Sequence, residues 1–196
     1  MCNVLKLFSL IAISITLQSC KDNINGIVSS LYNKKVYFNG KKQTLKSDTI
    51  IAGMDLYAPI KVVAYLNSTL CTQCIENYLS VSSKFMNHIG SDSVMYVCIL
   101  QPRQFDSLQA FMSKNNLPRL SIVIDTDNKY RIQNSISMYN NMFTTFLLDS
   151  DNRIVLIGDP LRSNKVRDLY EKHISLLIHN NGKKLKRSKI RKDNLF

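Results

Sequence analysis

Residues 61–76, with the sequence KVVAYLNSTLCTQCIE, carry the strongest structural signal in the chain. The β-branched and aromatic run from Val62 to Leu66 is typical of a strand that is buried on both faces. A short polar loop follows, and then Cys71 and Cys74 open a segment with apolar residues at helical spacing. The free N–H groups and the positive end of a helix stabilise a thiolate on the first cysteine of such a pair. This pattern predicts a redox dithiol on a turn from strand to helix.

Within that dithiol, we expect Cys71 to be the reactive, partly exposed thiol and Cys74 to be shielded in the first turn of the helix. Two other interpretations of the pair stay open. A zinc site would need four ligands, and the other candidates are Cys98, inside an apolar run, and three scattered histidines. A purely structural disulfide is the second alternative, because a CxxC pair alone does not prove turnover. We expect no metal and no cofactor.

The N-terminus has the pattern of an export signal. Lys6 precedes an apolar run, Leu7 to Leu17, which is too short to span a bilayer as a helix and favours a cleaved signal peptide. The run ends in Leu17-Gln18-Ser19-Cys20, which resembles the signal box of bacterial lipoproteins. That resemblance implies that Cys20 carries lipid and becomes the first residue of an extracytoplasmic, membrane-anchored protein. The alternative is ordinary secretion, with Cys20 as a spare thiol.

These assignments account for the five cysteines. Cys2 leaves with the signal peptide, and Cys98 lies in the apolar run VMYVCIL, where a cysteine is most often a small buried hydrophobic residue. Cys71 and Cys74 are then the remaining pair, and an exported location permits disulfide chemistry.

Composition and charge divide the chain into five parts. We predict a signal peptide over residues 1–19, a tether over 20–35, a short N-terminal β extension over 36–60, one domain over 61–180 and a basic tail over 181–196. Half of the formal net charge of +12 lies from Lys183 onward, in KKLKRSKIRK and the residues after it. Such a tail is most often solvated, and attraction to anionic lipid is the alternative. An exported protein meets little nucleic acid, and the tail lacks interleaved aromatic residues, so we expect no nucleic-acid partner.

The rest of the domain alternates strand and helix signals. A second buried strand, followed by an amphipathic helix, a third strand and a short helix, leads to an antiparallel hairpin and a closing helix. Strand–helix–strand order predicts a right-handed parallel unit. The segments are residues 93–100, 105–112, 120–124, 130–136, the hairpin 143–148 with 153–157, and a helix whose packed face holds Val166, Leu169, Tyr170, His173, Ile174 and Leu177.

This order resembles the thioredoxin fold, and within it the TlpA/ResA-like group of membrane-tethered thiol–disulfide oxidoreductases. The resemblance lies in KVVAYLNSTLCTQC, in IVID ending at Asp125, and in TTFLLDSDNRIVLIGDP from Thr144 to Pro160. It implies an α/β, thioredoxin-like fold with a central mixed β-sheet flanked by helices. It also implies that Cys71 is the nucleophile and Cys74 the resolving cysteine, acting on a protein thiol or disulfide with a membrane redox partner. Glu76 falls near the acidic position of that family and is a candidate proton acceptor, or else a solvated helix residue.

Three positions depart from the family pattern. Leu70 replaces the usual aromatic residue before the first cysteine, and Tyr65 stands where thioredoxins have a buried acid. Phe143 and Thr144 stand where the family has a cis-proline, which faces the CxxC and presents its backbone to the substrate. A cis peptide bond without proline is costly. We therefore expect a trans peptide bond here and a substrate-facing loop of different shape.

These departures keep two other functions open. One is a lipid-anchored binding module in which Cys71 and Cys74 form a structural staple. The other is a peroxiredoxin-like peroxidase, although residues 142–145 lack the arginine that such a site needs.

Overall fold

The protein is described here by a computed structural model. The structure describes residues 26, 28–38, 56, 58–66, 70–100, 110–111, 114–115, 117, 119–125, 129–135 and 144–184.

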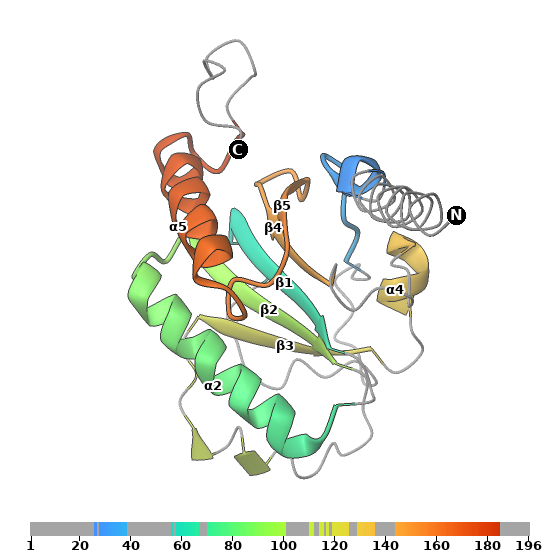
Figure 1. The fold of residues 1–196 in the computed structure, drawn as a ribbon, viewed down its shortest axis with the longest axis vertical. Helices are drawn as coiled ribbons and strands as arrows, with labels where there is room; N and C mark the ends of the chain where they lie inside the picture. Colours follow the sequence, from blue (N-terminus) through green and yellow to red (C-terminus); the bar gives the residue numbers. More distant parts are fainter. Residues whose placement is uncertain are drawn as a thin grey trace, which may run out of the picture.

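A mixed sheet of five strands forms the centre of the domain (Figure 1). Its order is β3-β2-β1-β4-β5; β1, β2 and β3 are parallel, while β4 runs antiparallel to β1 and β5 antiparallel to β4. The expected central mixed α/β sheet, its parallel strand–helix–strand unit and its antiparallel hairpin are confirmed. The strands are β1 Ile60–Leu66, β2 Val94–Leu100, β3 Leu120–Ile124, β4 Thr145–Leu148 and β5 Ile154–Ile157.

Two hydrophobic cores enclose the sheet. On one face, α2 (Thr72–Ile89) and α5 (Asn164–His179) pack through side chains such as Leu79, Met86 and Ile174. On the other face, α4 (Lys129–Asn134) and the N-terminal segment supply Tyr130 and Val36. Every residue of β1 and β2 is buried, because both faces of the parallel strands are covered. The two-sided burial expected from the run around Val62 is therefore present.

Helix α2 has well-defined ends. Cys71 is its N-cap residue, and Gly90 ends it in the left-handed conformation with φ 64°. Glycine suits this place because it adopts positive φ without the steric cost that a Cβ brings, and the Gly90 N–H still donates to the Met86 carbonyl.

A pair of tyrosines fixes α2 on the sheet. The hydroxyl oxygens of Tyr78, on α2, and Tyr96, on β2, lie 2.8 Å apart, and their rings meet edge to face with centroids 6.4 Å apart. Burial raises the pKa of both phenols, so the pair stays neutral and hydrogen-bonded. The sequence pattern treats Tyr78 only as an apolar helix position.

The other helix expectations have mixed outcomes. The short helix expected at residues 130–136 is α4, and α5 is the closing helix, with Tyr170, Ile174 and Leu177 buried. Leu169 is 47% exposed, so its assignment to the packed face was wrong. Of the helix expected around residues 105–112, Ala110 and Phe111 are helical and most of the remainder lies outside the described residues.

The N-terminal segment packs against the hairpin. Residues 28–31 are helical, the Asn33 N–H donates to the Ile154 carbonyl, and Lys35 forms an isolated antiparallel bridge with Arg153. The packed part of the chain therefore begins before residue 36, within the segment expected to be tether. Of the expected β extension, 36–38 belong to no strand of the sheet, and the predicted turn at Asn39 lies outside the described residues. Cys20 also lies outside them.

Within the described part of the chain, no helix is long and apolar enough to cross a membrane.

Tyr78→Phe should lower the free energy of unfolding by about 1–3 kcal/mol, because it leaves the buried Tyr96 hydroxyl without its partner. The double variant Tyr78→Phe/Tyr96→Phe removes both hydroxyls and should lose less than that single variant. Denaturant unfolding with the disulfide intact measures both values. A double variant that loses the sum of the two single losses would show that the hydroxyl pair contributes no coupling.

Candidate active site

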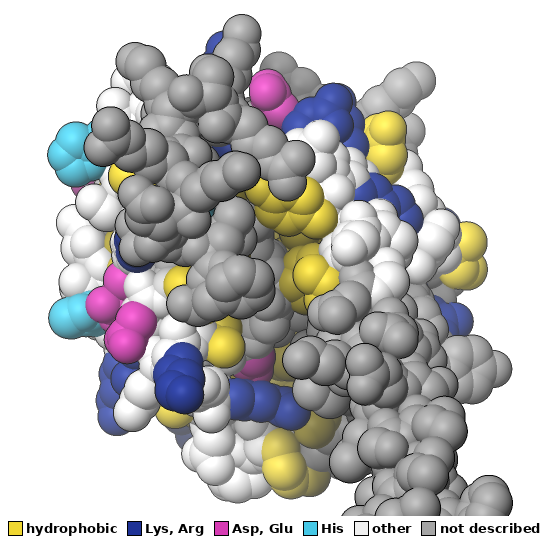
Figure 2. Space-filling model, turned by 45° about the horizontal axis from the view of Figure 1, so that its top comes forward, with side chains coloured by type: hydrophobic (Ala, Val, Ile, Leu, Met, Phe, Trp, Pro, Cys, Tyr) yellow, Lys and Arg dark blue, Asp and Glu magenta, His cyan; other side chains and the backbone are white. Residues whose placement is uncertain are grey.

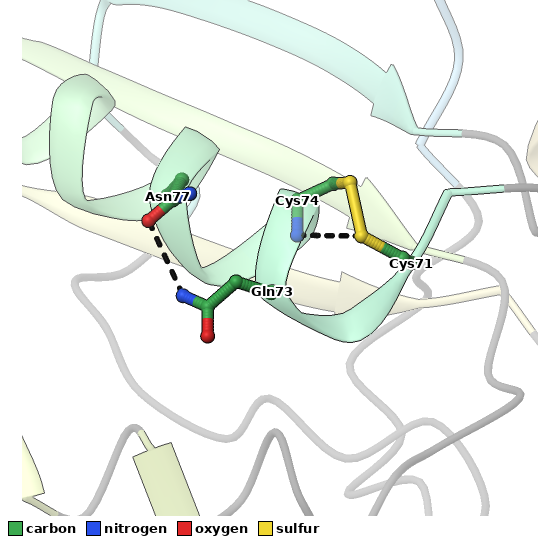
Figure 3. Close-up of a disulfide and its surroundings, with 4 residues drawn as sticks. All are labelled: Cys71, Gln73, Cys74 and Asn77. Atoms are coloured by element: carbon green, nitrogen blue, oxygen red, sulfur yellow. Dashed lines mark hydrogen bonds between the residues drawn. A yellow bond between two sulfur atoms is a disulfide. The ribbon is translucent and has the colours of Figure 1, made fainter.

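Cys71 and Cys74 lie at the start of α2, after the central strand β1 ends. Strand β1 ends at Leu66, and Cys71 follows as the N-cap of α2 with an extended backbone, φ −70° and ψ 154°. Its Sγ accepts a hydrogen bond from the backbone N–H of Cys74 at 3.1 Å (Figure 3). A sulfur thus occupies the position that a serine or aspartate oxygen takes in an ordinary helix cap. The strand-to-helix placement of the pair is as the sequence predicts.

The two cysteines are joined. Cys71 and Cys74 form a disulfide with their Cα atoms 5.1 Å apart, so the structure represents the oxidised form (Figure 3). Both residues are exposed. The expectation that Cys74 is shielded was therefore wrong: at the exposed start of α2, its position inside the first turn does not bury it. Either sulfur is accessible to another thiol.

The electrostatic setting favours negative charge on the Cys71 sulfur. The first turn of α2 contains no acidic residue, and its unpaired amide groups carry the positive end of the helix dipole. One turn along the helix, the Gln73 side-chain amide donates to the Asn77 side-chain oxygen Oδ1 at 3.3 Å (Figure 3). When the disulfide is reduced, the Cys74 N–H is already in place to stabilise a thiolate.

Glu76 lies beyond the first turn of α2. Residues two apart on a helix do not face each other, so helix spacing does not place Glu76 beside Cys74. The backbone carbonyl of Glu76 accepts a hydrogen bond from the Ser80 hydroxyl at 2.9 Å. Glu76 is half-buried, and its part in proton transfer stays a prediction.

Thr144 lies at the same edge of the sheet as the dithiol. Its carbonyl accepts a hydrogen bond from the Tyr65 N–H at 2.9 Å, next to the carboxyl end of β1. Phe143 lies outside the described residues. Tyr65 itself stacks on Tyr130, with ring centroids 6.1 Å apart, and burial together with the Asp125 carboxylate raises the pKa of its phenol. The position of the thioredoxin acid is thus occupied by a neutral, stacked ring.

Cys98 takes no part in the site. It is fully buried in β2, and burial raises the pKa of its thiol well above the usual value, which keeps it neutral and unreactive. This agrees with its interpretation as a small hydrophobic residue. Across the described residues, no cluster of three or more His, Cys, Asp or Glu side chains could hold a metal ion.

Tyr78 contributes to the site in a way that the sequence pattern did not reveal. Tyr78 follows Cys74 by four residues, so both lie on the same side of α2, and the Tyr96 contact anchors that side on the sheet. The signal that could have revealed it is a tyrosine one turn after the CxxC together with a second tyrosine in the next strand.

The fold is thioredoxin-like. No family model and no curated protein matches the sequence. Among solved structures, the chain is similar to StoA from Bacillus subtilis, with 21% identity over 52% of this chain and 73% of that one and a TM-score of 0.40. The exposed lipoprotein thioredoxin Etrx1 from Streptococcus pneumoniae is 14% identical over 65% and 99%, with a TM-score of 0.44. A yeast mitochondrial 1-Cys peroxiredoxin is 13% identical over 63% and 66%, also with a TM-score of 0.44. At these levels the comparisons concern the fold and assign no activity.

Proposed function

We propose that this protein is a thiol–disulfide oxidoreductase of the bacterial cell envelope, lipid-anchored outside the cytoplasm, whose reacting groups are Cys71 and Cys74. The observation that carries the proposal is the exposed residue Cys71 at the N-cap of α2, whose sulfur is bonded to Cys74 and accepts a hydrogen bond from the Cys74 N–H. A structural staple needs neither the exposure nor the helix end. A nucleophilic thiolate benefits from both.

The reaction proceeds by two exchanges. The Cys71 thiolate attacks one sulfur of a substrate disulfide; the Cys71–substrate bond forms, the substrate S–S bond breaks, and the other substrate sulfur leaves as a thiolate that takes up a proton. The Cys74 sulfur, as thiolate after losing its proton to solvent, then attacks Cys71 and releases the second substrate thiol. Substrate is reduced and the Cys71–Cys74 disulfide forms. A dithiol redox partner in the membrane then reduces the Cys71–Cys74 disulfide again. The relative reduction potentials of the two pairs set the direction in which electrons flow.

Proteins are the proposed substrates. Both cysteines are exposed at the start of α2, and Leu70, 37% exposed, offers an apolar contact beside Cys71. Phe143 and Thr144 are the proposed substrate-facing loop from the resemblance, and Thr144 lies at this edge of the sheet through its bond to Tyr65. This setting suits an extended peptide.

The reduction potential of the Cys71–Cys74 pair tests the proposal. We expect the pair to equilibrate with glutathione buffers, with a potential above about −300 mV, because helix-end stabilisation of the thiolate favours the reduced form. Titration of the full chain, followed by alkylation and mass mapping of the Cys71–Cys74 peptide, measures it.

A potential below about −300 mV would contradict this function and favour the binding module with a structural staple. Glu76→Gln decides whether the glutamate takes part: because residues two apart on a helix do not face each other, we expect the potential to change by less than about 30 mV, the equivalent of about 1.4 kcal/mol.

The anchor is proposed from the signal box at Cys20. Cys20→Ala should leave the disulfide and the thiol activity unchanged and should move the protein from the membrane fraction to the soluble fraction, since acyl chains provide most of the membrane affinity. Fractionation of expressing cells, with immunodetection, measures the shift. Retention of the variant on membranes in high salt would show an uncleaved signal segment or another anchor.

A further inference from the structure

Cations and exposed tyrosines gather on the N-terminal segment, the β4–β5 turn and the residues that follow α5. We call this region the basic–tyrosine surface and define it as Tyr32, Lys35, Tyr37, Arg153, Lys183 and Lys184. Tyr32 is 42% exposed and Tyr37 50% exposed. Neither the dithiol nor the core uses these side chains.

Contacts between three segments of the chain hold this surface together. The Lys184 ammonium lies 3.7 Å from the centroid of the Tyr32 ring, and the Lys35 ammonium lies 5.8 Å from that of Tyr37. Lys35 is bridged to Arg153, whose guanidinium donates to the Asn33 carbonyl at 3.1 Å. Each tyrosine therefore has a cation within reach of its ring, and each ring keeps an exposed edge.

The charge of the surface is strongly one-sided. The described segments 28–38, 149–157 and 180–184 form this surface, and among their residues the one acidic side chain that is exposed is Asp151. Asp149 is buried, and its carboxylate accepts the N–H groups of Asp151 and Arg153. Figure 2, which brings this end of the molecule forward, shows dark blue Lys and Arg side chains interspersed with yellow hydrophobic ones at its upper right.

The topology places this surface away from the redox site. Arg153 follows the turn between β4 and β5, which lies at the end where β1 begins, whereas Cys71 follows the end of β1 (Figure 1). The seven residues of β1 separate the two edges by roughly 20 Å. In the sequence, Tyr32 and Lys35 lie within the segment 20–35 that was expected to be the tether from Cys20, and the rest of the basic tail directly follows Lys184.

We infer that the basic–tyrosine surface docks on an anionic lipid bilayer, with the tyrosine rings at the headgroup level and the cations on lipid phosphates. Cations on exposed amphipathic rings are the chemistry of a membrane interface, and the proposed lipid anchor and tail join the domain beside this surface. The inference rests on the proposed anchoring outside the cytoplasm and does not depend on turnover at Cys71. Docking in this orientation turns the Cys71–Cys74 disulfide away from the membrane, toward exported proteins.

Tryptophan fluorescence can test docking because the chain contains no tryptophan. Tyr37→Trp, in the full chain, places a single reporter on the surface. With vesicles of phosphatidylcholine and phosphatidylglycerol at low salt, we expect emission to shift to shorter wavelength and brominated lipid to quench it. In about 1 M salt, where the screening length is about 3 Å, the docked state should be lost. Vesicles of phosphatidylcholine alone should give no shift.

The matched control is Leu169→Trp, which places the reporter on α5 at a site 47% exposed, close to the exposure of Tyr37. The tryptophan at this position should stay solvated with both kinds of vesicle.

Adding Lys35→Gln and Lys183→Gln to Tyr37→Trp should lower the ratio of docked to undocked molecules about 25-fold, since each basic residue near the bilayer contributes about five-fold.

Equal signals from both reporters, or a signal that appears only with an acidic polypeptide or RNA in place of vesicles, would overturn the inference. The reduction potential of the Cys71–Cys74 pair in glutathione buffers, measured on the same variants, should be the same in all of them. A failure of docking with a potential in the range of glutathione buffers thus refutes the lipid surface alone, whereas a potential below that range refutes the proposed oxidoreductase.

Discussion

The hydrogen bond from the Cys74 N–H to the Cys71 sulfur joins the fold of this protein to its proposed chemistry. A helix must end its hydrogen-bond ladder with unpaired N–H groups, and here a cysteine sulfur caps them. The bond exists only because α2 begins directly after the central strand and places Cys71 at the cap. Since the donor is backbone, it remains when the disulfide is reduced, and the first turn contains no acid to oppose a thiolate.

The rest of the domain holds this helix end still. Strands β1 and β2 are buried along their whole length, and the Tyr78–Tyr96 hydroxyl pair attaches α2 to β2 one turn behind Cys74. Both phenols are neutral because burial raises their pKa, so the contact does not change within the physiological pH range. Cys98, buried on β2, is kept from competing with the exposed pair. A rigid support beneath two accessible sulfurs is what repeated thiol exchange requires.

Sequence periodicity predicted the sheet, its parallel and antiparallel halves and the position of the dithiol, because these follow from buried apolar runs and from one CxxC at a strand–helix turn. It misplaced features that depend on tertiary packing. Leu169 has the spacing of a packed residue but lies on the open side of α5, and the polar segment before Val36 packs on the hairpin through backbone hydrogen bonds that no composition reveals. Cys74 was expected to be shielded because it lies within a helical turn, yet burial depends on what covers that turn. The tyrosine pair joins residues 18 positions apart, and hydrophobic periodicity treats both members only as apolar.

The central claim is that the Cys71 sulfur at the N-cap of α2 is a nucleophile for protein disulfides. The most direct measurement is the capture of a disulfide-bonded peptide by the reduced full chain carrying Cys74→Ser, which keeps the donating backbone N–H and removes the resolving thiol. The account predicts a stable mixed disulfide that maps to Cys71 and forms with a half-maximal pH below about 8.5, the usual value for a free cysteine. Absence of the adduct, or equal capture at Cys74 in a Cys71→Ser chain, would contradict it.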